Sequence, residues 1–247
     1  MTLESVALPL LASDFSGLTY APQFETNTAT VTINVGRAIV VNSTADPGDG
    51  TADVAETTLR EAIDLANATP GADNIVFDIP TGDPGYDPVT GAFTIQPLSA
   101  LPTITDPVTL DATTQPGFAG TPIIELDGSL AGSDGLVITA DSSTVRGLVV
   151  NRFSGNGIFL DGGSYNAVEG NFIGTDVTGL VALSNGGDGV RISHGAGANR
   201  IGTNGDGLAD EAERNVISGN TLAGVGIEDV GTDDNVVAGN YIGTDVT

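Results

Sequence analysis

The sequence contains no cysteine, no lysine and no tryptophan, and it has a single histidine. Without cysteine the chain can form neither disulfides nor thiolate metal sites. Its cationic side chains are seven arginines, against 32 aspartates and glutamates, which gives a formal net charge of −25. This charge repels phosphate backbones and anionic membrane surfaces, so we expect no nucleic-acid partner.

Long hydrophobic runs are also missing. No apolar stretch approaches the ~20 residues that a membrane-spanning helix needs, so we expect no membrane span. The N-terminal segment, residues 1–12, is apolar, but no positive charge precedes it, which makes it a poor secretory signal. We therefore expect either another export route or a longer parent protein.

Four short segments in the second half share one design. Each starts with a glycine, and the first and third residues after that glycine are aliphatic, whereas the middle residue varies. The segments start at Gly135, Gly157, Gly189 and Gly224, and their aliphatic pairs are Leu136/Ile138, Ile158/Leu160, Val190/Ile192 and Val225/Ile227. A period of two is typical of a strand with one buried face.

A second set of aliphatic residues keeps step with these glycines. Val145, Val168, Ile201 and Val237 are spaced by 23, 33 and 36 residues, and the glycines by 22, 32 and 35. A bare unit of about 22 residues suits one coil of a β-solenoid. Residues 166–178 also return, little changed, as residues 235–247, and we expect the recurring turn asparagines to stack through their amides.

One segment predicts a helix. Thr58 and Glu61 fit a capping box, in which the hydroxyl and the carboxylate each accept a hydrogen bond from a backbone N–H group that the helix leaves free. The apolar residues Leu59, Ala62, Ile63 and Ala66 fall on one face. A helix of about ten residues needs tertiary packing to persist, so we expect this face to cover the N-terminal end of the solenoid core.

Three regions follow from these patterns. Residues 1–37 are expected to be a leader or the tail of a preceding β module, with a strand over residues 30–35. Residues 38–106 hold the capping segment and the first irregular coils. Residues 107–247 form the solenoid, which we expect to be truncated because Thr247 lies inside a repeated segment and no atypical capping repeat is visible.

The motifs resemble a known family. Residues 42–77, with Thr58-Leu-Arg-Glu-Ala-Ile63 at their centre, are similar to the CSLREA-type segment that begins right-handed parallel β-helices in large bacterial surface proteins, and the later Asn-Phe-Ile-Gly-Thr-Asp repeats are similar to those proteins too. The resemblance covers roughly residues 39–247. It departs at Ala52 and Thr57, which occupy the places of two cysteines that the family often carries.

These observations together predict an all-β chain: a right-handed parallel β-helix, or solenoid, with a short amphipathic N-terminal capping helix. The resemblance implies a secreted protein at the bacterial cell surface and supplies no defined activity. We expect a structural or adhesive role rather than an enzymatic one. The expected partners are further repeats or modules of the same longer chain and surface carbohydrate.

An enzyme is the first alternative, because parallel β-helices often host polysaccharide lyases and hydrolases. The fourth residues after the four glycines are Thr139, Asp161, Ser193 and Glu228. The fifth position adds His194 and Asp229, and Arg191 stands at the second position. All of these are expected on one outer face. Asp161 and Glu228, two coils apart, would then be the candidate carboxylate pair of an inverting glycosidase, with Arg191 and His194 as auxiliary groups.

A calcium-dependent binding module is the second alternative, since a hard cation prefers carboxylate and amide oxygens. Part of an EF-hand-like loop is formed by Asn204, Asp206, Asp210 and Glu213, although Gly202 stands where the first ligand is expected. Asp176 and Asp245 share a Gly-Thr-Asp turn and are further candidate ligands. The competing interpretation for the first segment is a variant of the repeat's own loop, because it aligns with residues 173–180. For the Gly-Thr-Asp turn it is capping of the backbone by the aspartate side chain.

Overall fold

The computed structural model describes residues 37–48, 50–52 and 55–244. By its contacts the chain divides into two units, residues 1–33 and 34–247. The first unit lies outside the described residues, and so does almost all of the leader or preceding β module predicted over residues 1–37, with its strand at 30–35. The second unit is described below.

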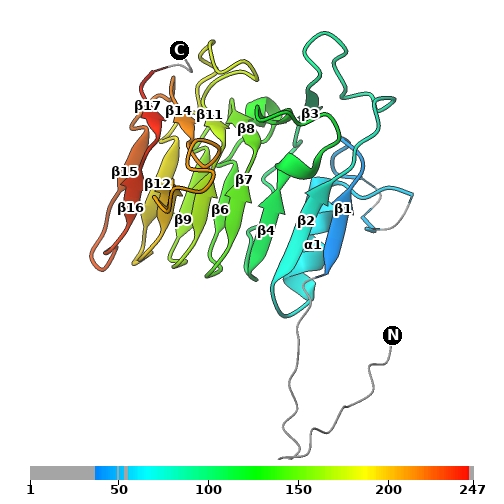
Figure 1. The fold of residues 1–247 in the computed structure, drawn as a ribbon. Coiled ribbons are helices and arrows are strands. Elements are labelled where there is room, and N and C mark those ends of the chain that lie inside the picture. Colours follow the sequence, from blue (N-terminus) through cyan, green and yellow to red (C-terminus); the bar gives the residue numbers. More distant parts are fainter. Residues whose placement is uncertain (1–36, 49, 53–54, 245–247) are drawn as a thin grey trace, which may run out of the picture. The chain divides into compact units, whose positions relative to one another are not determined.

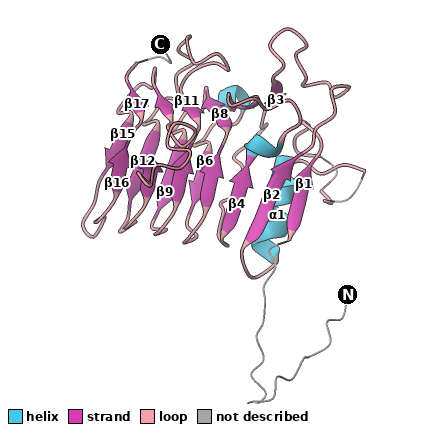
Figure 2. Ribbon diagram, viewed as in Figure 1, coloured by secondary structure: helices cyan, strands magenta, loops and turns pink. Residues whose placement is uncertain are grey.

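Strands dominate the second unit, and all pairings between its named strands are parallel (Figures 1 and 2). The strands are β1 (Ala38–Val41), β2 (Asp73–Phe77), β3 (Phe93–Ile95), β4 (Val108–Asp111), β5 (Ile124–Asp127), β6 (Leu136–Ile138), β7 (Thr144–Arg146), β8 (Leu148–Asn151), β9 (Ile158–Asp161), β10 (Ala167–Glu169), β11 (Phe172–Ile173), β12 (Val190–Ser193), β13 (Arg200–Gly202), β14 (Val216–Ile217), β15 (Val225–Ile227), β16 (Val236–Ala238) and β17 (Tyr241–Ile242). The helices are α1 (Leu59–Ala68) and the 3-10 turns η1 (Ala112–Thr114) and η2 (Gly128–Leu130).

The strands form three parallel sheets. The seven-stranded sheet has the order β1-β2-β4-β7-β10-β13-β16, the six-stranded sheet β3-β5-β8-β11-β14-β17, and the four-stranded sheet β6-β9-β12-β15. From β6 onward the chain visits the four-, seven- and six-stranded sheets in that order, in the rounds β6–β8, β9–β11, β12–β14 and β15–β17. The β-rich class predicted from the sequence is confirmed.

The glycine-led segments form the four-stranded sheet in the predicted register. Ile192 pairs with Leu160 on one side and with Ile227 on the other. Glycine leads these segments because the backbones of neighbouring rounds approach each other closely at this position. A Cβ atom on Gly157 would lie 2.7 Å from the carbonyl oxygen of Gly189, which leaves no room for a side chain.

Aliphatic residues also line up in columns along the two larger sheets. The column of the seven-stranded sheet is Ile39, Ile75, Leu110, Val145, Val168, Ile201 and Val237, and that of the six-stranded sheet is Ile95, Leu126, Val150, Ile173, Ile217 and Ile242. Both columns are buried except for their last members, Val237 and Ile242, which are 39% and 47% exposed. In the described part of the chain no strand pairs with the outer edges of β15, β16 and β17.

Buried asparagines link successive rounds at the turn before the seven-stranded sheet. The backbone N–H of Asn166 donates to Oδ1 of Asn199 (2.8 Å), and that of Asn199 donates to Oδ1 of Asn235 (2.9 Å). The Asn199 amide nitrogen also donates to the carbonyl oxygen of Gly163 (3.0 Å). This arrangement confirms the stacking of turn asparagines that the repeats predict.

A second asparagine ladder runs along the turn before the six-stranded sheet. The N–H of Asn171 donates to Oδ1 of Asn215 (2.9 Å), and the N–H of Asn215 donates to Oδ1 of Asn240 (3.1 Å). Asn171 and Asn215 are fully buried. Their amides are tolerated in the interior because donors and acceptors are paired: the Nδ2 groups of Asn171 and Asn215 donate to the carbonyl oxygens of Val145 and Val168. In the first ladder, Nδ2 of Asn166 has no partner among the described residues.

Helix α1 has the capping box predicted for it. The Thr58 hydroxyl accepts a hydrogen bond from the backbone N–H of Glu61. In return, the Glu61 carboxylate accepts a hydrogen bond from the backbone N–H of Thr58 (2.8 Å). The predicted apolar face, Leu59, Ala62, Ile63 and Ala66, is buried in the same core as the strand columns. The helix packs against β1 and β2, at the end of the seven-stranded sheet (Figure 1). Within the described residues no helix is long and apolar enough to cross a membrane.

The register of the four-stranded sheet predicts a sharp contrast between neighbouring residues. Ile192→Ala should lower the free energy of unfolding by about 2–5 kcal/mol, because it removes a fully buried side chain between Leu160 and Ile227. Arg191→Gln, one residue away and facing outward, should cost less than about 1 kcal/mol, because it removes only partly exposed ion pairs. Equal losses in urea unfolding would contradict the register.

Candidate functional site

The outer face of the four-stranded sheet gathers the residues predicted as a catalytic alternative. Phe159, Arg191 and Gly226 pair with one another across β9, β12 and β15, and Asp161 pairs with Ser193. Glu228 follows β15 directly, and its backbone N–H donates to the carbonyl oxygen of Ile192 (3.0 Å). Parallel register therefore brings Arg191, Asp161 and Glu228 to one surface.

Arg191 forms the first charged group on this face. Its Nη2 lies 2.6 Å from Oε2 of Glu228, and its Nη1 lies 3.8 Å from Oδ2 of Asp188. Asp188 is 4% exposed, and a Cβ atom on Gly226 would lie 2.5 Å from its Oδ2. A side chain at the middle position of the β15 segment would therefore displace the Asp188 carboxylate.

His194 forms the second charged group. Its Nδ1 is hydrogen-bonded to Oδ1 of Asp161, and its Nε2 lies 3.6 Å from Oδ2 of Asp229. The backbone N–H of His194 also donates to the Asp229 carboxylate (3.2 Å), and the ring centroid lies 6.0 Å from that of Phe159. The hydrogen bond and the charge of Asp161, with a smaller effect of Asp229, raise the pKa of His194 above its usual value.

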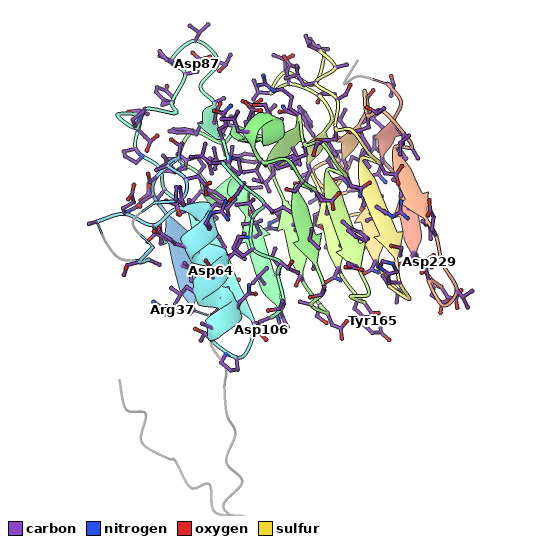
Figure 3. The ribbon with its side chains drawn as sticks, turned by 180° about the vertical axis from the view of Figure 1, so that it is seen from behind. Arg37, Asp64, Asp87, Asp106, Tyr165 and Asp229 are labelled. Atoms are coloured by element: carbon purple, nitrogen blue, oxygen red, sulfur yellow. The ribbon has the colours of Figure 1, made fainter. Side chains whose placement is uncertain are left out.

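Turns place His194 and Asp229 at one edge of the sheet. His194 has φ 58 and Asp229 has φ 74, so both adopt the left-handed conformation that ends a strand abruptly. Figure 3 shows Asp229, and with it Tyr165, at turns that lead from the four-stranded into the seven-stranded sheet. The outer-face prediction is wrong for Ser193, which is fully buried.

The two candidate catalytic carboxylates each have a cationic or cation-forming partner. Asp161 pairs with His194, and Glu228 pairs with Arg191. An inverting glycosidase needs one carboxylic acid that holds its proton, whereas a nearby cation stabilises the ionised form. The geometry fits a pair of surface ion pairs better than it fits an acid and a base.

The EF-hand-like loop between β13 and β14 uses its oxygens for internal hydrogen bonds. Oε2 of Glu213 accepts from the N–H of Asn204 (2.8 Å), and Oδ1 of Asp206 accepts from the N–H of Leu208 (2.7 Å). Oδ1 of Asp210 accepts from the Thr203 hydroxyl (2.8 Å). These hydrogen bonds join residues within the loop, and carboxylates make such bonds in turns that bind no metal.

The Asp176 turn follows the capping interpretation. Its carboxylate accepts from the Thr178 hydroxyl (2.8 Å) and from the backbone N–H groups of Leu180 (3.2 Å) and Val181 (3.1 Å). Asp245, its counterpart in the repeat, lies outside the described residues. Across the described ranges, no three His, Asp or Glu residues are grouped so that they could hold a metal ion. Calcium binding stays a prediction.

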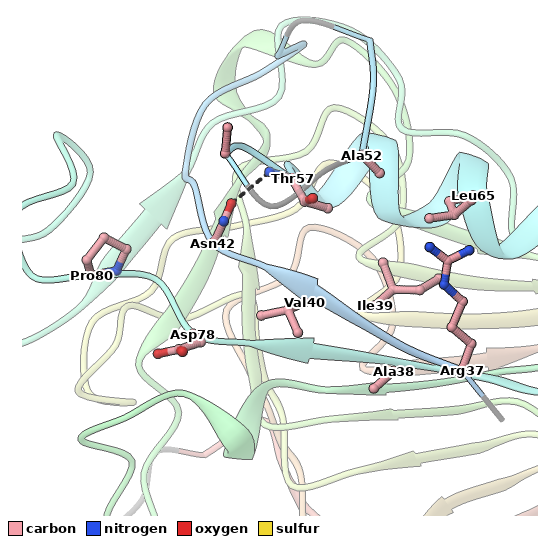
Figure 4. Close-up of a pocket in the computed structure, with 11 residues that line it drawn as sticks. Arg37, Ala38, Ile39, Val40, Asn42, Ala52, Thr57, Leu65, Asp78 and Pro80 are labelled. Carbon is pink, nitrogen blue, oxygen red and sulfur yellow. Dashed lines mark hydrogen bonds between the residues drawn. The ribbon is translucent and has the colours of Figure 1, made fainter. Parts of the chain in front are cut away.

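A cavity of about 640 Å³ lies beside β1, the edge strand of the seven-stranded sheet (Figure 4). One side of its lining carries Asn42, whose Oδ1 accepts from the backbone N–H of Thr57 (2.7 Å). Its charged lining residues are Arg37 and Asp78. The described residues that line the cavity include one carboxylate and no histidine, so they do not form an acid–base pair.

The fold and site together define a β-rich chain of three parallel sheets with ion-paired residues on an outer face. No protein-family model matches the chain, and no curated protein matches it. One residue of the site, Asp188, was missed in the sequence. It stands directly before a marker glycine, and the Gly187-Asp188-Gly189 spacing was its available signal. Asp229, at the fifth position after Gly224, was placed on the outer face from the sequence, and it contacts His194 there.

The His194 pair predicts a pH-dependent contribution to stability. Because the folded pKa is raised, this contribution is fully present below the unfolded histidine pKa of about 6.5, and it is lost as the pH rises through the folded value. His194 is the only histidine, so an NMR titration of its ring reports it without assignment. Asp161→Asn should lower the titration midpoint, whereas Asp64→Asn, at an exposed position of α1, should leave it unchanged. A wild-type midpoint at or below that of the urea-unfolded chain would contradict the ion pair.

Proposed function

We propose that the chain forms a right-handed parallel β-helix and serves as a structural or adhesive segment of an extracellular bacterial surface protein. The observation that carries the proposal is the fixed order in which four successive rounds visit three parallel sheets. Neighbouring strands in each sheet come from successive rounds, which is the connectivity expected of a solenoid. The amphipathic α1 at β1 and β2 corresponds to the expected capping helix.

The resemblance to CSLREA-type surface proteins supports the location. The capping box of α1 lies within the segment that carries the resemblance, and its Thr58 and Glu61 adopt the hydrogen bonds expected there. The net charge of −25 suits a protein that stays soluble and apart from anionic surfaces.

Further repeats or modules of the same longer chain are the partners that the proposal favours. Ile227, Val237 and Ile242 continue the buried columns but are 39–47% exposed. The outer edges of β15–β17 have no partner strand among the described residues. Another parallel round would bury the exposed part of these side chains and pair these backbone groups. Since each side chain is already more than half buried, it would contribute less than half of the about 1.5–3 kcal/mol that full burial gives.

The enzyme alternative keeps one supporting observation, the gathering of Asp161, His194, Arg191 and Glu228 on one face. A polysaccharide lyase or inverting glycosidase would use this face. The ion pairs that hold both carboxylates argue for a structural purpose.

Labelling of the producing bacterium tests the proposed location. Antibodies raised against the chain should label intact cells, and brief protease treatment of intact cells should remove the signal. A signal that requires permeabilised cells would contradict a surface role.

A depolymerisation assay separates the structural role from the enzyme alternative. Purified chain incubated with pectate, alginate and neutral polysaccharides should release no new reducing ends or unsaturated products. Turnover that Asp161→Asn or Glu228→Gln abolishes, while Asp64→Asn leaves it unchanged, would establish the enzyme instead.

A further inference from the structure

A second cavity, of about 370 Å³, lies where the seven-stranded sheet meets the six-stranded sheet. Two short turns, at Gly147 and Gly170, line it between two longer loops, residues 112–123 and residues 203–215. It is distinct from the outer face of the four-stranded sheet, since it shares none of the residues of the His194 and Arg191 groups. Small-ligand sites commonly occupy about 300–1,000 Å³.

One side of this corner cavity is apolar and aromatic. Phe172 of β11, Val216 of β14 and Tyr241 of β17 pair in register along the outer face of the six-stranded sheet. All three line the cavity, and Phe118 adds another ring from the loop over residues 112–123. Register between rounds therefore assembles a flat apolar row from residues far apart in the sequence.

The other side is polar and held by ion pairs. Arg146 pairs with Asp111, with Nη2 2.5 Å from Oδ2, and its Nη1 lies 3.8 Å from Oε1 of Glu169. Glu169 also pairs with Arg200 (2.5 Å), which lies 3.8 Å from Glu213. Burial raises the pKa of Asp111, but the hydrogen bonds from Arg146 and Thr113 and the charge of Arg146 together lower it more. The pKa therefore lies below its usual value. This alternating series fixes the side chains that line the polar side.

Arg214 joins the two sides. Its guanidinium carbon lies 5.8 Å from the centre of the Tyr241 ring, and its Nη1 lies 3.3 Å from the Tyr241 hydroxyl oxygen. No ion pair of the described residues includes Arg214. The Nε–H groups of Arg146 and Arg214 are covered from solvent and have no acceptor among the described residues. A ligand in the cavity therefore cannot reach these two groups. Nη2 of Arg214, by contrast, has no hydrogen-bond or ion-pair partner among the described residues and is the donor that this cavity-lining side chain can offer to a ligand.

The lining selects the chemistry of that ligand. An aromatic row favours a ligand with an apolar face, and the arginine donors and glutamate acceptors favour a ligand with several hydroxyl groups. The charged lining residues are two arginines and three glutamates, a balance of 2 − 3 = −1, within a chain of net charge −25. An anionic ligand is disfavoured by both charges.

We propose that this corner cavity binds a pyranose ring of a neutral polysaccharide. The ring face packs on Phe172 and Tyr241, and the Arg214 guanidinium donates a hydrogen bond to a hydroxyl oxygen of the ring. The loops over residues 112–123 and 203–215 flank the bound ring. The binding goes beyond the proposed structural role, and it does not depend on where the protein is located.

Isothermal titration with defined sugars tests the proposal. The probes are the neutral tetrasaccharides of β-1,4-linked glucose, mannose and galactose, with tetragalacturonate as the anionic comparison. At least one neutral probe should bind, and more tightly than tetragalacturonate. Tyr241→Ala and Arg214→Gln should each weaken that binding at least tenfold. Both side chains are at least partly accessible, and a thermal melt of each variant checks that it folds.

Matched controls locate the site. Tyr165→Ala removes an exposed tyrosine at a distant turn, and Phe159→Ala removes a ring from the outer face of the four-stranded sheet; neither should change the affinity. The proposal is overturned if no neutral probe binds, or if tetragalacturonate binds more tightly than every neutral probe. It is also overturned if Phe159→Ala weakens binding while Tyr241→Ala and Arg214→Gln do not.

Discussion

The pairing of buried asparagine amides along the turns is the interaction on which the rest of the structure depends. The strands from β6 to β17 are all two to four residues long, so each contributes few hydrogen bonds to its sheet. At the turns, the amides of Asn199 and Asn215 supply acceptors to the N–H groups of Asn166 and Asn171 and donors to backbone carbonyl groups. An unpaired buried amide costs about 1–3 kcal/mol, so a shift in register by one residue is penalised at every turn.

The fixed register between rounds brings outward-facing residues from distant parts of the sequence together on one surface. It aligns Arg191 with Phe159 on the four-stranded sheet, and it aligns Phe172 with Tyr241, through Val216, on the six-stranded sheet. The same alignment repeats the aliphatic columns inside. The inner columns stabilise the chain, whereas the outer rows vary from round to round and are free to carry binding groups.

The features that could be predicted from the sequence are the ones with a repeating or local pattern. The glycine-led period of two predicted β6, β9, β12 and β15 with their register, and the capping box predicted α1, because each rests on local chemistry. The corner cavity was not predicted. The repeat of residues 166–178 as 235–247 aligns Phe172 with Tyr241, but Phe118 comes from the loop over residues 112–123, which lies outside this repeat. Ser193 was assigned to the outer face from its position, but the fold buries it. The grouping of Asp161 with His194 followed from register, although their direct pairing did not.

The unfolding free energy of Asn199→Ala tests the central claim most directly. The substitution leaves the N–H of Asn166 without its acceptor and the carbonyl oxygen of Gly163 without its donor, in a fully buried position. We expect the free energy of unfolding, measured by equilibrium urea denaturation, to fall by about 2–4 kcal/mol, because buried polar groups are left unpaired. Asn204→Ala, in the exposed loop after β13, should cost less than about 1 kcal/mol. A loss for Asn199→Ala no larger than that for Asn204→Ala would contradict the role assigned to the ladders.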